Sequence, residues 1–201
     1  YKSVGLLSGG VFYKKLNDFI YTYRDNQYTN AKFSQDFPNL ANPIPAVNPG
    51  NWSLTQERNG ENVSVYGFEV AVQRQLDFIP GKFFKGLGVY LNYTFTDSEA
   101  KGITNADGEE RKDVTLPGTA PHMFNSSLSW ENKKFSARIS LNYAADYLDE
   151  LGGDSFDDRF YDKQTFIDAN ASYKLTFKLR VFAEANNLTN LPREVSFWHK
   201  N

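Results

Sequence analysis

The sequence predicts an all-β chain, an antiparallel sheet of the kind that forms transmembrane β-barrels. Apolar and polar residues alternate over most of the 201 residues, as in strands with one apolar and one polar face. The alternating segments are about ten to thirteen residues long, which exceeds the usual soluble strand and suits a tilted strand that crosses a bilayer. Short and long connections also follow each other in turn, which is typical of outer-membrane barrels.

The N-terminal part contains two strand-like stretches, about residues 2–14 and 18–30. Only residues 14–18 lie between them, so we expect a tight turn there and two antiparallel neighbours. The segment that follows, about residues 31–62, is rich in Asn, Pro and Gly, which favour loops. This part is therefore expected to form a strand pair followed by a long loop.

The next two strands, about residues 64–76 and 87–97, alternate clearly. Their apolar positions are Tyr66, Phe68, Val70, Val72, Leu87, Val89, Leu91, Tyr93 and Phe95. The residues between these positions are mostly polar or small, so each strand is expected to have one apolar and one hydrophilic face. Residues 77–86 are expected to form the medium-length turn that joins the two strands.

The cleanest alternation lies in residues 135–147, and a less regular strand covers about residues 123–130. The apolar face of the former carries Phe135, Ala137, Ile139, Leu141, Tyr143, Ala145 and Tyr147. A long charged loop, about 97–120, precedes these strands, and residues 131–134 join them in a tight turn. Aromatic residues lie near both ends of the pair, where a barrel needs its interfacial girdles.

The last two predicted strands cover about residues 165–175 and 179–187. A long acidic loop, about 148–163, precedes them, and the tight turn 174–178 joins them. The whole chain thus predicts about eight strands, with short turns on the periplasmic side and long loops on the extracellular side.

Composition excludes several classes of function. A net charge of −2 gives the chain no general attraction for nucleic acid, so no nucleic-acid partner is expected. The absence of Cys excludes a disulfide scaffold, thiolate metal sites and a Cys nucleophile. His122 and His199 lack metal-ligand spacing, and no catalytic combination of residues occurs. We therefore expect a chain that is not an enzyme and has no cofactor, with one exception considered below.

Four segments carry a resemblance to a known family. They are VYGFEVAV at 65–72, GVYLNYTFTD at 88–97, LPGTAPHMF at 116–124 and FAEANNLTN at 182–190. In this order and spacing they resemble the last third of the barrel of TonB-dependent outer-membrane receptors. The Gly-x-Glu strand and the closing Asn-Leu-Thr-Asn are the most specific of these elements.

The resemblance implies a fold, a location and a set of partners. Family members are barrels of about 22 strands, plugged by an N-terminal domain, in the outer membrane of Gram-negative bacteria. They import scarce nutrients such as siderophores, haem, oligosaccharides or peptides. The implied partners are membrane lipid and lipopolysaccharide, the plug domain, the TonB–ExbB–ExbD complex through the N-terminal part, the substrate and, for glycans or peptides, an outer-membrane surface lipoprotein.

The chain departs from the family pattern at both ends. It opens at Tyr1 inside a strand, and after Asn-Leu-Thr-Asn it stops at Asn201 without the family's last strand. We therefore expect residues 1–201 to be a C-terminal portion of the barrel, without the plug domain and the last strand.

The hydrophilic faces of the strands supply the first set of candidate site residues. Charged side chains on the lipid side would cost about 2–4 kcal/mol at the midplane, so polar residues are expected to face the lumen and meet the plug or the substrate. The candidates are Glu69, Gln73, Asn92, Arg138, Asn142, Asp168, Arg180 and Glu184.

The acidic loop supplies the second set. Hard cations take six to eight oxygen ligands, so this loop could bind Ca²⁺, although a solvated loop facing lipopolysaccharide is the simpler interpretation. The candidate ligands are Asp149, Glu150, Asp154, Asp157 and Asp158. In loop 31–62 and beside it, Tyr28, Phe33, Phe37 and Trp52 would suit stacking on sugars.

Three other interpretations stay open at this point. A soluble or surface β-sandwich that binds glycans would hide its apolar faces between two sheets. A complete eight-stranded outer-membrane barrel would fit the length. An outer-membrane enzyme in a small barrel would need a catalytic cluster, which the sequence lacks.

Overall fold

The computed structural model describes residues 5–41, 52–112 and 114–197. Twelve strands form most of the described chain: β1 Leu6–Asn17, β2 Ile20–Tyr28, β3 Trp52–Asn59, β4 Asn62–Gln75, β5 Leu87–Lys101, β6 His122–Glu131, β7 Phe135–Ala144, β8 Tyr147–Glu150, β9 Arg159–Tyr161, β10 Gln164–Lys174, β11 Arg180–Ala185 and β12 Val195–Ser196. A short helix, α1 Asn30–Asp36, and a 3-10 turn, η1 Phe84–Gly86, complete the elements. Neither has the length and hydropathy that a helix needs to cross a membrane, and the described residues form no other helix.

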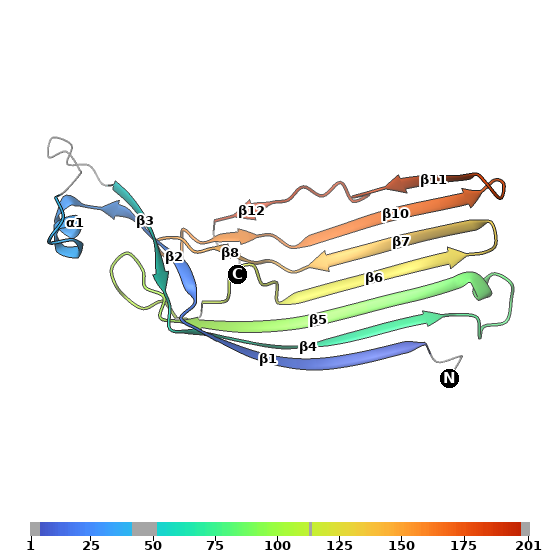
Figure 1. Ribbon diagram of the computed structural model, residues 1–201, viewed down its shortest axis with the longest axis horizontal. Helices are drawn as coiled ribbons and strands as arrows, with labels where there is room; N and C mark the ends of the chain where they lie inside the picture. Colours follow the sequence, from blue (N-terminus) through green and yellow to red (C-terminus); the bar gives the residue numbers. More distant parts are fainter. Residues whose placement is uncertain (1–4, 42–51, 113, 198–201) are drawn as a thin grey trace.

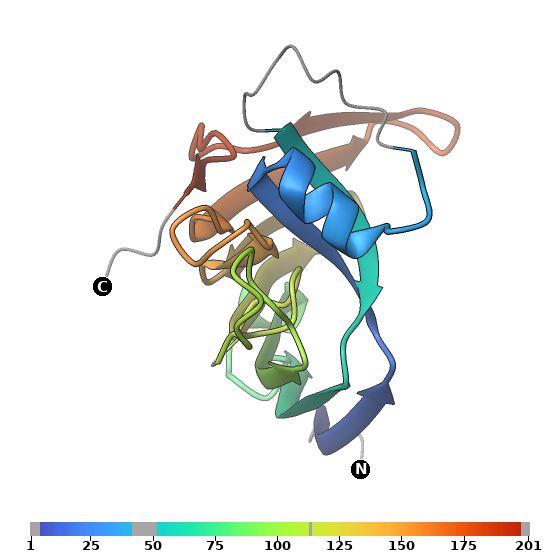
Figure 2. The ribbon, with the colours of Figure 1, turned by 90° about the vertical axis from the view of Figure 1, so that its left-hand side faces the viewer.

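Seven long strands form one antiparallel sheet in the order β1-β4-β5-β6-β7-β10-β11 (Figure 1). The register is regular along every pair, without a bulge. Viewed along its strands, the sheet is curved and open (Figure 2). In the described residues β1 and β11 pair with only one neighbour each, so these strands do not form a closed eight-stranded barrel.

The two ends of the sheet differ, as the connection lengths predicted. The tight β6–β7 and β10–β11 turns and the β4–β5 connection lie together at one end, and the long connections lie at the other (Figure 1). The small sheets β2-β3 and β12-β9-β8 also lie at the long-loop end. Residues 42–51 and His199, considered above, lie outside the described residues.

The predicted turn at residues 14–18 is wrong. β1 continues into β2 without reversing, and the two pair with β4 and β3 respectively, so that residues 6–28 and 52–75 form the arms of one long hairpin. Backbone hydrogen bonds cross the junction, from Asp18 N to Glu61 O (2.9 Å) and from Gly60 N to Phe19 O (2.8 Å). The positive φ of Asp18, 53°, bends the arm instead of closing it. The main sheet therefore has seven strands instead of about eight.

The long loop predicted over residues 31–62 also differs in the structure, because two of its parts form regular elements. Its first part forms α1, whose N-cap Thr29 accepts a hydrogen bond from Lys32 N (3.2 Å). Its last part is β3, paired with β2. The alternation of short and long connections remains, because the hairpin tip is the first long connection.

One face of the main sheet is apolar and uncovered. Cross-strand partners share a face, and the pairing brings Val89, Leu128, Ile139 and Ala169 into one row. Large apolar residues on this face are accessible, Val11 at 87% and Ile139 at 47%. Among the described residues no second sheet packs on it, so the arrangement is not a β-sandwich.

Candidate functional site

The described parts of the three long connections pack into one unit at the long-loop end, which we call the loop unit. It consists of β2 and β3 with α1, residues 102–112 and 114–121 of loop 102–121, and the β8–β9 hairpin. Its apolar core consists of Tyr21, Tyr23, Val63, Val65, Ala100, Ile103, Val114, Leu148 and Leu151. Ile103 is 1% exposed and Val63 is not exposed at all. The long connections are therefore held together by a core of their own, separate from the apolar face of the sheet.

Hydrogen bonds join the connections around this core. The Tyr21 hydroxyl lies 3.0 Å from Thr104 Oγ1 and accepts a bond from Thr104 N (3.2 Å). Between loop 102–121 and the β8–β9 hairpin, Ala106 N donates to Gly153 O (3.2 Å) and Gly118 N to Leu148 O (2.7 Å). All three connections therefore keep one relative arrangement.

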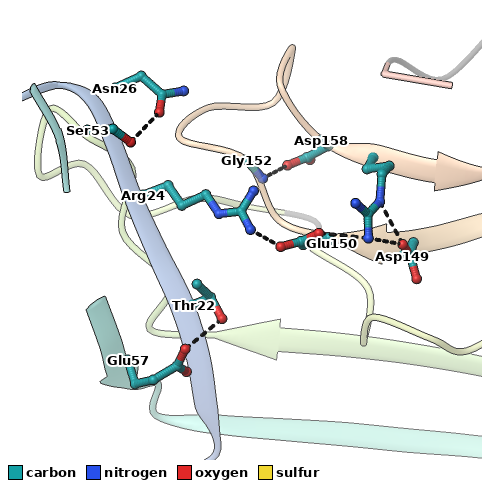
Figure 3. Close-up of polar contacts among 10 residues, drawn as sticks. Thr22, Arg24, Asn26, Ser53, Glu57, Asp149, Glu150, Gly152 and Asp158 are labelled. Carbon is teal, nitrogen blue, oxygen red and sulfur yellow. Dashed lines mark hydrogen bonds and ion pairs between the residues drawn. The ribbon is translucent and has the colours of Figure 1, made fainter. Parts of the chain in front are cut away.

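A charged network links β2 to the β8–β9 hairpin (Figure 3). Arg24 forms an ion pair with Glu150, whose other oxygen lies 2.7 Å from Arg159 Nη2. Arg159 also binds Asp149, at 2.6 Å. Two arginines thus neutralise two of the predicted calcium ligands.

Arg111 forms a second, more deeply buried pair with Asp158. Its Nη1 donates to Asp158 Oδ1 (2.9 Å), and Nη2 contacts Oδ2. The two side chains are only 11% and 6% exposed. Gly152 N also donates to Asp158 Oδ1 (2.9 Å; Figure 3). The pair anchors loop 102–121 on the β8–β9 hairpin.

A second buried carboxylate, Asp25, fixes α1. Asp25, 1% exposed, accepts bonds from Gln27 N and from Lys32 Nζ, both at 2.8 Å. Lys32 Nζ also donates to Ala106 O (3.2 Å), so it connects the helix to loop 102–121. The hydrogen bond to Asp25 raises the pKa of Lys32 and keeps its charge in place.

Tyr28 has a structural role and is not accessible for stacking on a sugar. It is 4% exposed, pairs across the hairpin with Trp52, and donates its hydroxyl to Asp36 Oδ2 (2.7 Å). Burial, together with this bond, raises the pKa of Tyr28 to about 12. The rings of Phe33 and Phe37 pack on each other, with centroids 5.2 Å apart.

The remaining predicted calcium ligands are turn residues. Asp154 Oδ1 accepts bonds from Phe156 N (2.7 Å) and Asp157 N (3.2 Å). Within the described residues, no group of three or more acidic or His side chains has the arrangement of a metal site. Calcium binding stays a prediction. The contacts of Asp149, Glu150 and Asp158 with arginine would compete with calcium for these carboxylates.

All of the predicted lumen-facing side chains share the other face of the main sheet. These are Glu69, Gln73, Asn92, Arg138, Asn142, Asp168, Arg180 and Glu184. One row of cross-strand partners runs from Gln73 through Tyr90, Ser127 and Ser140 to Asp168. In the next row Asn125 Nδ2 donates to Asn92 Oδ1 (3.4 Å). That this face lines a lumen stays a prediction.

A hollow of about 580 Å³ lies where the loop unit meets the sheet. Its lining includes Thr96, Ser98, Thr119, His122, Tyr147 and Phe160. His122 Nδ1 lies 2.8 Å from the Tyr93 hydroxyl. Charged side chains also line it, namely Asp97, Arg111, Lys112, Asp146 and Asp158, and such a mixture of groups suits a polar organic ligand.

Sequence reasoning missed the basic partners of the acidic loop. Arg24 and Arg111 lie 126 and 47 residues away from the carboxylates that they bind. No local spacing indicates pairs of this kind, since they depend on how the long connections pack. Only Arg159, inside the loop, could be found from the sequence.

The comparisons with known proteins agree with this architecture. A family model described as TonB-dependent receptor-like, β-barrel, matches residues 1–188. Two solved structures of variants of the ferric enterobactin receptor PfeA from Pseudomonas aeruginosa share the fold, with TM-scores of 0.52 and 0.51 and 15% sequence identity. They cover 91% of this chain, which spans 23% of theirs. A search among curated proteins found no match. The chain therefore belongs to the TonB-dependent receptor family and forms part of its β-barrel.

Proposed function

We propose that the complete receptor is an active importer in the outer membrane and takes up a scarce nutrient with energy delivered through TonB. The described strands supply part of the barrel wall, and the loop unit lies on the extracellular side. The family match supports this proposal, although the chain represents only 23% of the length of the solved receptors.

One structural observation carries the proposal: a long, regular sheet with one uncovered apolar face and all of its long connections at one end. Exposing so large an apolar face to water is unfavourable for a folded monomer, whereas the hydrocarbon core of a bilayer would cover it. The open edges at β1 and β11 require further strands, because lipid cannot satisfy unpaired backbone groups. The chain is thus proposed to work only inside a larger barrel.

The polar face is proposed to meet the receptor's own plug domain and the transport path. Its middle rows contain mainly amide and hydroxyl groups, including Asn92, Asn125, Ser127, Ser140 and Asn142. The TonB–ExbB–ExbD complex would act on the receptor through its N-terminal part. Lipopolysaccharide would surround the extracellular side, and a surface lipoprotein would join if the substrate is a glycan or peptide.

The substrate is proposed to be a siderophore, haem, an oligosaccharide or a peptide. The solved neighbours are named for ferric enterobactin, and the fold similarity alone does not transfer that ligand to this chain. The 580 Å³ hollow provides hydroxyl and aromatic groups on which any of these classes could bind.

Uptake by the full-length receptor tests the proposal. Cells with the receptor, without it, or with it but without TonB would receive labelled ferric siderophores, haem, oligosaccharides and peptides. We expect accumulation of one class only when receptor and TonB are both present. Equal uptake of every class in all three strains, or a receptor recovered in the soluble fraction, would overturn the proposal.

A further inference from the structure

The apolar face of the sheet has a hollow near the short-turn end, which we call the alanine hollow. Its volume is about 510 Å³. The floor consists of Ala137, Ala169, Ala171, Ala183 and Ala185, which the pairing of β7, β10 and β11 brings side by side. Larger residues, Leu128 and Ile139 among them, border it. The outer surface of the wall is therefore indented at this place.

The rim of the hollow nearest the turns is fixed. Trp130 Nε1 donates to Phe83 O (2.8 Å), and the two rings stack with centroids 5.9 Å apart. A Cβ on Gly86 would lie 2.3 Å from Glu131 O, so the β4–β5 connection packs closely on the end of β6. These contacts hold the Trp130 ring in place beside the alanines, and the hollow is a preformed feature.

Basic residues concentrate at the same end of the sheet. The segments 74–86, 131–134 and 174–180 contain eight Lys and Arg residues and two acidic ones. At the opposite end, segments 97–112 and 145–163 contain twelve acidic and five basic residues. The short-turn end is thus electropositive and attracts anionic head groups.

We propose that the alanine hollow holds an acyl chain of an anionic glycerophospholipid whose phosphate group pairs with the lysines of the short turns. This inference rests on the proposed outer-membrane location, with the short turns on the periplasmic side. The indented floor accepts an alkyl chain that a wall of larger side chains would exclude. The exposed lysines of the β6–β7 and β10–β11 turns, Lys133, Lys134 and Lys178, are three to five residues from the alanines of the adjoining strands and supply the matching charge.

Fluorescence quenching in the full-length receptor tests the proposal. The receptor, purified in detergent, is titrated with phosphatidylglycerol or with phosphatidylcholine, each carrying brominated acyl chains. The signal of Trp130 is the difference between the wild type and Trp130→Phe. We expect Trp130 to be quenched at several-fold lower concentrations of the brominated phosphatidylglycerol.

Matched variants separate this site from ordinary lipid contact. Ala171→Leu, which fills the hollow, should weaken the quenching several-fold, whereas Ser126→Leu, elsewhere on the same face, should not. The pair Lys133→Gln and Lys134→Gln should remove the preference for phosphatidylglycerol, whereas Lys163→Gln at the long-loop end should retain it. Equal quenching by both lipids, or no effect of Ala171→Leu, would overturn the proposal. The assay measures no transport, so its failure is distinct from failure of the uptake experiment.

Discussion

Arg111 and Asp158 lie 47 residues apart in the chain and form a two-pronged ion pair that is almost completely withdrawn from solvent. The pair lies where loop 102–121 meets the β8–β9 hairpin, beside the apolar core of the loop unit. Asp158 also accepts a bond from Gly152 N, so its carboxylate organises the hairpin as well. A charge pair thus determines how two of the long connections are arranged.

Removing the cation of this pair should loosen the loop unit. Arg111→Met leaves the Asp158 carboxylate buried without its counter-charge, which typically costs about 3–5 kcal/mol. We expect faster backbone hydrogen exchange in residues 100–112 and 148–161 of the full-length receptor, measured by mass spectrometry. The neighbouring exposed Lys112→Met is the control and should leave exchange unchanged.

Replacing both partners should undo part of this effect. In the double variant Arg111→Met with Asp158→Leu no buried charge remains, and apolar replacements of buried pairs are often tolerated. Exchange should then be slower than in Arg111→Met alone. If Arg111→Met exchanges like the wild type, the pair does not hold the loops together.

A charge on the apolar face should impair assembly, whereas the same charge one residue further should not. Ile139→Arg places a cation on the apolar face, which we propose to face lipid, at a cost of about 2–4 kcal/mol near the midplane. Ser140→Arg places it on the polar face, in the row that contains Ser127 and Asp168. Surface levels of the folded receptor, measured by heat-modifiable gel mobility, should fall only for Ile139→Arg. Equal levels of the two variants would contradict the assignment of the faces.

The close contact at Gly67 should make this residue irreplaceable. A Cβ there would lie 2.0 Å from Phe95 O and 2.7 Å from Phe12 Cζ, the ring of its cross-strand partner. Gly67→Ala is therefore expected to lower the amount of folded receptor several-fold in the same gel assay. Gly10→Ala is the control, since its Cβ would meet no atom within 4 Å. Equal amounts for both variants would contradict the packing of Phe12 over Gly67.

The two faces of the sheet could be predicted because alternation is local. The assignment of Ile139 and Arg138 to opposite faces follows from adjacent positions in one strand, and the family resemblance rests on short motifs in these same strands. The bend at Asp18 could not be predicted, since residues 14–18 have the length of a turn while their backbone groups pair with residues 61–65.

The packing of the loop unit could not be predicted from the sequence for a different reason. Its polar contacts join residues far apart in the chain, as between Tyr21 and Thr104 or Arg24 and Glu150. An acidic loop seen without these partners resembles a cation site. With them, three of its carboxylates bind arginine. Packing between loops therefore changes the interpretation of residues that composition alone identifies.

The Tyr28 phenol should lose its proton only at high pH, and its hydrogen bond to Asp36 should be one cause. Burial and the hydrogen bond to Asp36 raise its pKa from 10 to about 12. The folded state thus favours the neutral phenol. This contribution to stability is fully present below pH 10 and is lost as the pH rises through about 12. Asp36→Asn should lower the pKa but leave it above 10, because burial remains.

Tyrosinate absorbance near 295 nm measures this titration. The signal of Tyr28 is the difference between the receptor and its Tyr28→Phe variant, recorded with and without Asp36→Asn. An unchanged titration after Asp36→Asn would show that the carboxylate does not act on the phenol.

Disulfide trapping distinguishes the long hairpin from a turn at residues 14–18. The sequence has no Cys, so an introduced pair has no competitor within this stretch. Thr22 pairs with Glu57 across β2 and β3, and directly opposed residues have Cα atoms about 4.5–5.5 Å apart, within reach of a disulfide. Thr22→Cys with Glu57→Cys should cross-link under mild oxidation, as shown by peptide mass spectrometry. Thr22→Cys with Gly10→Cys, which a turn centred on Leu16 would bring together, should not. Cross-linking of the second pair instead of the first would mean that β1 and β2 form a hairpin with each other and that β2 does not pair with β3.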